Sequence, residues 1–113
     1  MIEVGTFAAT PEEEPFPGVR RRSFDAEGAT VTEYRFEPGA TFPRHRHAQE
    51  QITMVAAGTV SMTIEGEASE IGPGGYSVVG PQVEHGITAG PEGARFLAVV
   101  TPRRGARDEY EVE

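Results

Sequence analysis

The sequence predicts an all-β fold, a sandwich or barrel built from many short strands. Fourteen glycines and nine prolines are scattered through the 113 residues, and they separate short stretches of alternating sequence rich in β-branched side chains. No helical period persists for three turns. Short strands at near-regular spacing are typical of a sandwich or barrel. We expect strands over residues 18–23, 30–37, 42–47, 51–57, 59–64, 68–71, 76–79, 84–89 and 94–101.

Turn signals lie between the predicted strands. Glycine reaches positive φ and proline fixes φ, so both favour turns. They mark residues 37–39, 58, 65–67, 72–75, 80–81 and 90–93. The length suits a single domain, 1–113, with its barrel at about 31–101. The N-terminal arm, 1–18, contains Pro11 and Pro15 and is expected to be an edge strand or arm, because proline cannot donate to a ladder. The charged C-terminal tail, 103–113, is expected at the surface.

Charge and composition exclude several classes of partner. Eighteen acidic residues against ten basic ones give a formal charge of -8, which repels nucleic acid and anionic membranes. The chain has no cysteine, so any metal must be bound by nitrogen and oxygen ligands. The sequence shows no basic cluster followed by an apolar run at its start, and no stretch of the ~20 apolar residues that a membrane span needs. We therefore expect a cytoplasmic protein with no nucleic-acid partner and no membrane contact.

The spacing of the three histidines allows them to meet at one metal site. His45 and His47 are separated by one residue, so their side chains leave a strand on the same face. Gln51 shares this parity if the chain stays extended, and its side-chain oxygen can reach the same place. His85 follows a Gly-Pro turn into another strand. Two interpretations stay open from the spacing alone: the histidines are surface or hydrogen-bonded core residues, or His45, His47, Gln51 and His85 bind one divalent ion (Zn, Ni, Mn or Fe).

The spacing around these residues resembles the two motifs of the cupin family. The first motif runs glycine, five residues, His-x-His, three or four residues, glutamate, six residues, glycine; the matching residues are Gly39, His45, His47, Gln51 and Gly58, with Gln51 at the glutamate position. In the second motif Gly74 and His85 fit, while Gly80 and Gln82 replace its proline and second glycine. The resemblance covers about 31–101 and implies a double-stranded β-helix, the cupin or jelly-roll barrel, with a bound metal.

Gln51 gives the predicted site its chemical character. Glu50 stands beside it, but its spacing to His47 is one residue short of the motif and strand parity turns it outward. A neutral amide in place of a carboxylate leaves the ion its full divalent charge, which strengthens it as a Lewis acid.

Residues 45–53 look particularly like the pectin-degradation (KdgF-like) cupins, which linearise 4,5-unsaturated uronates. The run Thr101-Pro102-Arg103-Arg104 and the run Arg107-Asp108-Glu109-Tyr110 also resemble the end of those proteins. The resemblance implies that Arg104 binds a sugar carboxylate bidentately. Where that group presents an aspartate and a phenylalanine from its last strand, this chain has Ala98 and Val100. Tyr34, in the strand before the first motif, and Glu84 are the other acid/base candidates.

Three functions follow as alternatives. The first is an isomerase- or lyase-type enzyme whose metal polarises an oxygen of a small acidic or sugar-like substrate. The second is a metal-dependent dioxygenase, and the third is a non-catalytic module that binds a small ligand. In each case we expect a small-molecule ligand and a homodimer formed through exchanged edge strands.

The remaining side chains have simpler interpretations. Arg44 and Arg46 alternate with the histidines and should form ion pairs outside the barrel, and Glu84 should be a solvated acid. Arginines 20–22 read as a solvated or interface run. The large apolar side chains are expected to fill the barrel: Phe36, Phe42, Met54, Met62, Tyr76 and Phe96.

Overall fold

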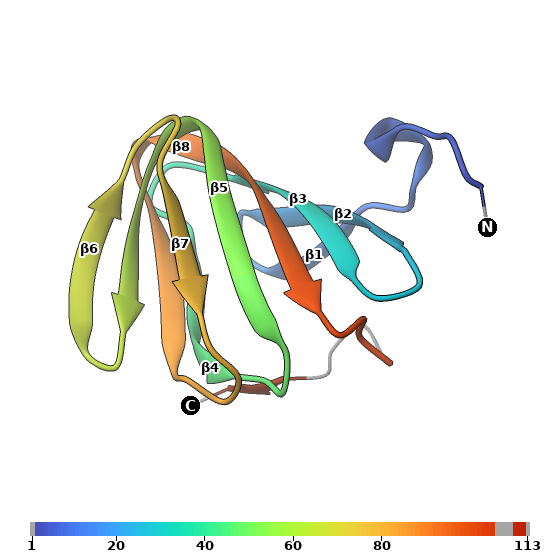
Figure 1. Ribbon diagram of the computed structural model, residues 1–113. Coiled ribbons are helices and arrows are strands. Elements are labelled where there is room, and N and C mark those ends of the chain that lie inside the picture. The colour runs from blue at the N-terminus through green and yellow to red at the C-terminus, as the bar shows by residue number, and fades with distance from the viewer. Residues whose placement is uncertain (1, 106–109, 113) are drawn as a thin grey trace.

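The computed structural model describes residues 2–105 and 110–112 of the chain. Over these residues it confirms the predicted all-β barrel (Figure 1). A short 3-10 turn, η1 (Phe7–Ala9), precedes the strands. The strands are β1 (Glu13–Phe16), β2 (Val19–Asp25), β3 (Thr30–Phe36), β4 (Thr41–Arg46), β5 (Glu50–Ile64), β6 (Glu67–Ile71), β7 (Tyr76–Val79), β8 (His85–Thr101) and β9 (Glu111–Val112).

Two long strands, β5 and β8, belong to both walls of the barrel. They pair antiparallel along their whole lengths, from Glu50 opposite Thr101 to Ile64 opposite His85. One wall holds β1, β2, β3 and β7 beside the first half of β5 and the second half of β8. The other holds β4, β6 and β9 beside the remaining halves. The two walls curl over one another, and the core lies between them (Figure 1).

The predicted turns at residue 58 and residues 90–93 are bends inside β5 and β8. The predicted strands 51–57 and 59–64 are therefore one strand, β5, and the predicted strands 84–89 and 94–101 are one strand, β8. Gly58 has a φ of 70°, and the register between β5 and β8 shifts on both sides of it. A Cβ on Gly58 would lie 2.0 Å from the carbonyl oxygen of Gly93. Glycine lets the two backbones cross this closely, which is how a strand turns a barrel corner without ending.

The bend also reverses which side chains face the interior. In the first half of β5 the buried residues have odd numbers, such as Thr53 and Val55, and after Gly58 they have even numbers, such as Val60 and Met62. An extra residue in a bulge shifts the alternation by one. The single bend therefore decides which β5 side chains reach the core.

Most of the predicted barrel filling is confirmed. Phe36, Phe42, Met62 and Phe96 are buried, and the aromatic rings contact one another and Tyr34 at centroid distances of 5.1 to 6.2 Å.

Two of the expected filling residues are not in the barrel. Met54 is 40% exposed and Tyr76 is 71% exposed. Met54 lies opposite Tyr76 in the β5–β7 pair, and Gln51 and Thr53 take the inward positions of β5. Strand alternation therefore turns Met54 and Tyr76 outward together.

The arginine run at 20–22 has one buried member. Arg21 is 2% exposed and forms an ion pair with Glu13, 3.0 Å between Nε and Oε1, because β1 pairs with β2 at this register. Arg20 lies at the surface, 3.2 Å from Glu37. The run was expected to be solvated or to lie at an interface, and its central residue is instead buried beside β1.

The first and last described strands lie at the ends of the strand order. The strand β1, which contains Pro15, pairs only with β2 among the described strands. At the other end β9 pairs with β4, an element that the sequence did not predict. Residues 106–109 lie outside the described residues, so of the run Arg107-Asp108-Glu109-Tyr110 only Tyr110 is described. No described helix has the length and apolar character needed to cross a membrane.

Candidate metal centre

The three predicted histidines come together at one end of the barrel. His45 lies near the end of β4, His47 just beyond it, and His85 opens β8, directly opposite His45 in the β4–β8 pair. One ring nitrogen of each lies within 4.8 Å of the others, and all three side chains are buried. Such a group of imidazoles could hold a metal ion.

Each ring is held by the main chain. The Nδ1 atom of each histidine lies within hydrogen-bond distance of a backbone carbonyl two residues away, and a carbonyl can only accept, so Nδ1 carries the proton. The acceptors for His45, His47 and His85 are the carbonyl oxygens of Pro43, Gln49 and Val83, at 2.8, 2.9 and 2.9 Å. In the neutral ring this leaves the Nε2 lone pair pointing into the cluster, the arrangement found at histidine metal ligands.

Gln51 adds an oxygen to the same cluster. Its Oε1 lies 3.1 Å from His47 Nε2, and its amide nitrogen donates to the hydroxyl of Thr53, also at 3.1 Å. The bond to Thr53 sets the orientation of the amide, so the oxygen faces His47. With the His47 proton on Nδ1, two acceptor atoms face each other, an arrangement that a cation between them would relieve.

The Nε2 atom of His85 is buried. Its side chain is 1% exposed, and among the described residues its Nε2 has no hydrogen-bond partner. A buried nitrogen lone pair without a partner is costly, and a bound cation would satisfy it. The donor set of three imidazoles and one amide oxygen therefore fits a borderline divalent ion.

Burial keeps the three rings neutral. Desolvation, followed by the charge of His85, lowers the pKa of His45 to about 3. Desolvation is also the largest cause for His85, whose pKa falls to about 4 although its bond to Val83 opposes the shift. The pKa of His47 is lowered by desolvation and then by the charge of Arg104. At neutral pH no proton competes with a metal for these nitrogens.

Arg104 lies beside the histidines and is 7% exposed. Its backbone amide donates to the Thr30 hydroxyl at 3.1 Å, and its guanidinium lies 6.0 Å from the centroid of the Tyr110 ring. Its charge contributes to the lowered pKa of all three histidines. Among the described residues Arg104 Nε has no hydrogen-bond partner. A buried cation with a donor to spare suits an anionic ligand.

The interior next to the cluster is narrow and mostly apolar. A cavity of about 10 Å³ is lined by Tyr34, Phe36, Phe42, His45, Gln51, Ile87 and Phe96. This volume holds about one water molecule, so a larger substrate requires nearby side chains to move. Ala98 and Val100 face inward from β8, opposite Thr53 and Gln51, and they bring no acid to this wall. Glu84 turns away to an ion pair with Arg44 at 3.6 Å, as expected of a solvated acid.

Comparison with known protein families decides the classification. The Cupin domain family model matches residues 32–100, more than half of the chain. The chain belongs to the cupin family. The double-stranded β-helix and the His-x-His pair are thereby explained together, as the barrel and the first motif of a cupin.

Two characterised relatives are similar to this cupin. Pectin degradation protein KdgF of Dickeya dadantii is 29% identical over 97 residues, which cover 84% of this chain and 88% of that protein. Dimethylsulfoniopropionate lyase DddW of Ruegeria pomeroyi is 38% identical over 61 residues, 54% of this chain and 40% of that protein. The cupin thus spans less than half of the lyase.

Solved structures have the same fold. A W96F oxalate decarboxylase of Bacillus subtilis has a TM-score of 0.87 at 22% identity, with 96% of this cupin and 32% of that chain covered. An RmlC-like cupin of Shewanella frigidimarina has a TM-score of 0.82 at 22% identity, covering 96% and 95% of the two chains. KdgF of Halomonas sp. has a TM-score of 0.80 at 24% identity, covering 90% and 97%. At these identities the likeness establishes the fold alone.

Two residues near the cluster were assigned no role from the sequence. Thr53, which orients Gln51, is fully buried, and its inward parity two residues after Gln51 was the available signal. Tyr110 packs its ring against His45 and Phe42, at 5.6 and 5.3 Å between centroids, because β9 pairs with β4. Nothing local to Tyr110 predicts this pairing.

Proposed function

We propose that this cupin is a metal-dependent enzyme of the isomerase or lyase type that acts on a small carboxylate-bearing substrate. In this proposal His45, His47 and His85 supply Nε2, and Gln51 supplies Oε1, to one divalent ion. The observation that carries it is the pair of acceptors, His47 Nε2 and Gln51 Oε1, that face each other at 3.1 Å. When bound, such an ion acts as a Lewis acid that polarises a substrate oxygen.

Arg104 is the proposed carboxylate-binding residue. Its buried guanidinium and its Nε without a partner among the described residues support this role. Guanidinium binds carboxylate in a bidentate, charge-assisted geometry. Dimethylsulfoniopropionate, which the name of one relative identifies as its substrate, is itself a carboxylate.

Tyr34 is the proposed proton-transfer residue. It lines the small cavity together with His45 and Gln51. Apart from His45, it is the residue of that lining whose side chain can exchange a proton. Because Ala98 and Val100 supply no acid from the neighbouring strand β8, proton transfer at this position falls to the Tyr34 hydroxyl.

Elemental analysis of the purified protein tests the metal set. We expect one divalent ion per chain in the unsubstituted protein, little metal in His45→Ala, and strongly reduced metal in Gln51→Ala. Gln51→Glu is the matched control, because it keeps an oxygen ligand in place and should retain the ion. An undiminished metal content in both alanine variants would contradict the proposed ligand set.

Kinetics with two carboxylates, dimethylsulfoniopropionate and a 4,5-unsaturated uronate, test the reaction. Turnover of either is expected to require the metal. Arg104→Met should lower kcat/KM by about 100-fold, the cost of a lost charge-assisted pair of roughly 3 kcal/mol. The neighbouring Arg103→Met is the control, because Arg103 is exposed. Equal kinetics in the two variants would remove Arg104 from the site.

The apolar wall supports one alternative, a non-catalytic cupin that holds a small ligand. Ala98 and Val100 line the interior where an acid would assist catalysis. In that case a carboxylate would bind in an Arg104-dependent manner without turnover. Metal-dependent conversion of a carboxylate substrate, lost in Tyr34→Phe, would exclude it.

A further inference from the structure

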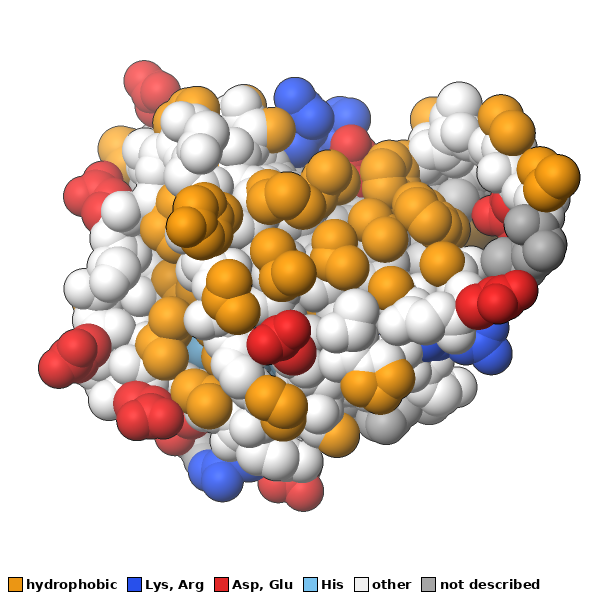
Figure 2. All heavy atoms as spheres, in the orientation of Figure 1, with side chains coloured by type: hydrophobic (Ala, Val, Ile, Leu, Met, Phe, Trp, Pro, Cys, Tyr) orange, Lys and Arg blue, Asp and Glu red, His pale blue; other side chains and the backbone are white. Residues whose placement is uncertain are grey.

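The position of Arg104 is not set by a strand. Arg104 lies between β8 and β9, outside the ladders that the described strands form. The proposed function nevertheless requires its guanidinium at a defined place beside the metal ligands. The Arg104 side chain is buried, and the histidines are almost wholly covered on the face shown in Figure 2. In such an enclosed site a small displacement of a binding group is costly, because solvent cannot replace a misplaced contact.

Thr30 holds the main chain of Arg104. Thr30 opens β3 and is fully buried. Its hydroxyl oxygen accepts the backbone N–H of Arg104 at 3.1 Å, and the hydroxyl donates its own proton to Asp25 Oδ1 at 2.6 Å. An ionised carboxylate can only accept, so the Thr30 proton points to Asp25 and the oxygen lone pairs face away from it. The two bonds form a directed series, which we name the Arg104–Thr30–Asp25 chain.

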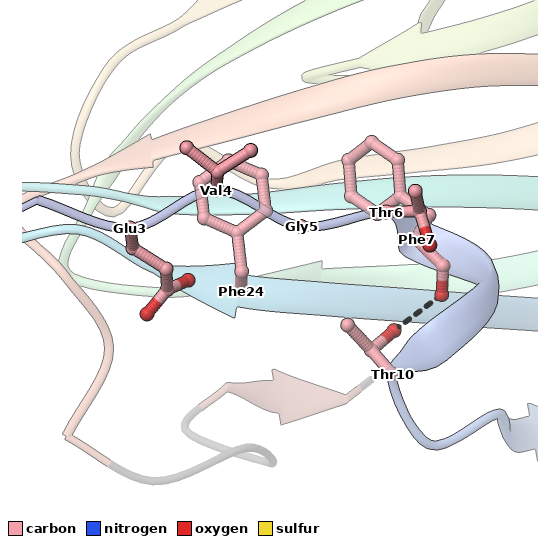
Figure 3. A pocket seen from close by; sticks show the side chains of 7 residues that line it. All are labelled: Glu3, Val4, Gly5, Thr6, Phe7, Thr10 and Phe24. Atoms are coloured by element: carbon pink, nitrogen blue, oxygen red, sulfur yellow. Dashed lines mark hydrogen bonds between the residues drawn. The ribbon is translucent and has the colours of Figure 1, made fainter.

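Strand register brings Asp25 to the metal end of the barrel. Asp25 ends β2 opposite Thr30, Thr30 lies opposite Val100, and Val100 lies opposite Gln51. Residues directly opposite one another share a face of a sheet, so a single inward row joins the proposed ligand Gln51 to an acid. The preceding residue, Phe24, turns the other way, into the groove between the N-terminal arm and the sheet (Figure 3). The row therefore contains a carboxylate, although its position on β8 is Val100.

The hairpin between β2 and β3 does not need the side chain of Asp25. Its turn is closed by the main-chain bond from the Ala26 amide to the Ala29 carbonyl oxygen, at 2.8 Å. The ladder also pairs Asp25 with Thr30 through the backbone. The side-chain bond between these two residues therefore adds a contact that the turn itself does not require.

Contact through the backbone leaves the guanidinium of Arg104 available. Where a carboxylate binds an arginine directly, it occupies the planar donor fork that would recognise a substrate. Here the acid is linked to the backbone amide through a hydroxyl. Among the described residues Arg104 Nε has no hydrogen-bond partner. The chain thus fixes the main chain of Arg104 while it keeps this donor for an anion.

We propose that Thr30 and Asp25 are positioning residues, which place Arg104 to bind the carboxylate of the substrate. This inference deepens the proposed function and rests on it, because it takes Arg104 as the carboxylate-binding residue. Thr30 holds the backbone of Arg104, and Asp25 fixes the direction of the Thr30 hydroxyl. Loss of either contact should weaken recognition of a carboxylate group without removing the metal, because the chain ends at Arg104 and not at a metal ligand.

Binding of galacturonate and of its methyl ester to the full-length, metal-loaded protein tests the proposal. Galacturonate is a saturated uronate, so its binding is measured without turnover. The ester lacks the negative charge, so the ratio of the two dissociation constants, measured by calorimetry, isolates recognition of the carboxylate. We expect the unsubstituted protein to prefer the acid and Arg104→Met to abolish this preference. Thr30→Val should lower the preference about 10-fold, the cost of one buried hydrogen bond, with ester binding unchanged.

Two further variants and a control separate the members of the chain. Thr30→Ser keeps the hydroxyl and should retain the preference to within about 2-fold. Asp25→Ala leaves the Thr30 hydroxyl without its acceptor and should lower the preference about 3-fold. Thr32→Val is the matched control: it removes another buried hydroxyl from β3, one that bonds to Ser23 at 2.8 Å, and should leave the preference unchanged. Bound metal and circular dichroism report whether each variant is folded.

Two results would overturn the proposal in different ways. If Thr30→Val keeps the preference of Thr32→Val while Arg104→Met loses it, Arg104 binds the carboxylate but Thr30 does not position it. If the unsubstituted protein shows no preference for the acid, or the preference survives in Arg104→Met, the carboxylate role of Arg104 is wrong and the positioning role falls with it. If Thr30→Val does not fold, Asp25→Ala decides, because Asp25 is exposed. A preference equal to that of Thr32→Val then counts against the chain.

Discussion

The two faces of the first half of β5 differ in an unusual direction. The inward face carries polar side chains, Gln51 and Thr53, which are buried and hydrogen-bonded to each other. The outward face carries Ile52 and Met54, and Met54 is 40% exposed. If hydrophobicity alone decided the orientation of this strand, Ile52 and Met54 would face inward, and Gln51 and Thr53 would face outward. The metal-site candidate inside accounts for the buried polar residues, so functional chemistry overrides the usual burial pattern there.

The largest effect on the two faces of β5 is expected from a change at Gly58, the bend that decides which β5 side chains face inward. In Gly58→Ala the new Cβ meets the Gly93 carbonyl oxygen, and the positive φ adds strain. We expect a loss of about 4 kcal/mol or more in the free energy of unfolding, measured in urea. Gly39→Ala is the control: its φ is 73° and nothing lies within 4 Å of its added Cβ. It should cost only about 1 to 2 kcal/mol. Equal losses of unfolding free energy in the two variants would show that the close approach of Gly58 to Gly93 does not determine the stability.

A change of pH acts on the histidines that face Gln51 inside the barrel. The unfolded chain protonates histidine near pH 6.5, whereas the folded protein protonates His45 near pH 3 and His85 near pH 4. Between these values the unfolded state binds more protons, so the stability of the metal-free protein is fully present above pH 6.5 and falls as pH decreases. The expected slope is up to about 1.4 kcal/mol per pH unit for each ring. Urea unfolding in the presence of chelator measures it, and a flat profile from pH 7 to 5 would contradict it.

The smallest expected effect concerns the support of Gln51. Thr53→Val removes the hydroxyl that accepts the Gln51 amide hydrogen but keeps the side-chain shape. The amide can then rotate, and we expect the proposed metal to bind about 10-fold more weakly, as is usual when a group that orients a ligand is lost. Competition with a chelator measures the affinity. Thr63→Val, on the outward side of β5 after the bend, should leave it unchanged.

The sequence contained enough to predict the barrel and the gathering of the histidines. Their spacing in the motif and their strand parity are local properties, and the structure brings His45, His47 and His85 within 4.8 Å. The continuity of β5 and β8 was missed because Gly58 and residues 90–93 have the composition of turns. Only the pairing of the two strands with each other shows that the chain passes through both without ending.

The errors at other positions have several sources. Met54 and Tyr76 were assigned to the barrel by their apolar character, although parity counted from Gln51 places Met54 outside. Arg21 was interpreted as part of a solvated or interface run, and it is buried because β1 brings Glu13 beside it. Tyr110 lies against His45 because β9 adds to β4. Glu13 is eight residues from Arg21, across the β1–β2 hairpin, whereas Tyr110 is far from His45 in sequence.

The carbonyl tethers of the three histidines have a consequence for variation of this chain. Pro43, Gln49 and Val83 orient the rings through their main-chain oxygens, so ring orientation is encoded by backbone shape rather than by side-chain chemistry. A residue at position 83 can therefore change identity and still hold His85. A search for carboxylates behind the imidazoles would overlook this support entirely, while any change that bends β4 or the start of β8 would loosen the rings without touching a ligand.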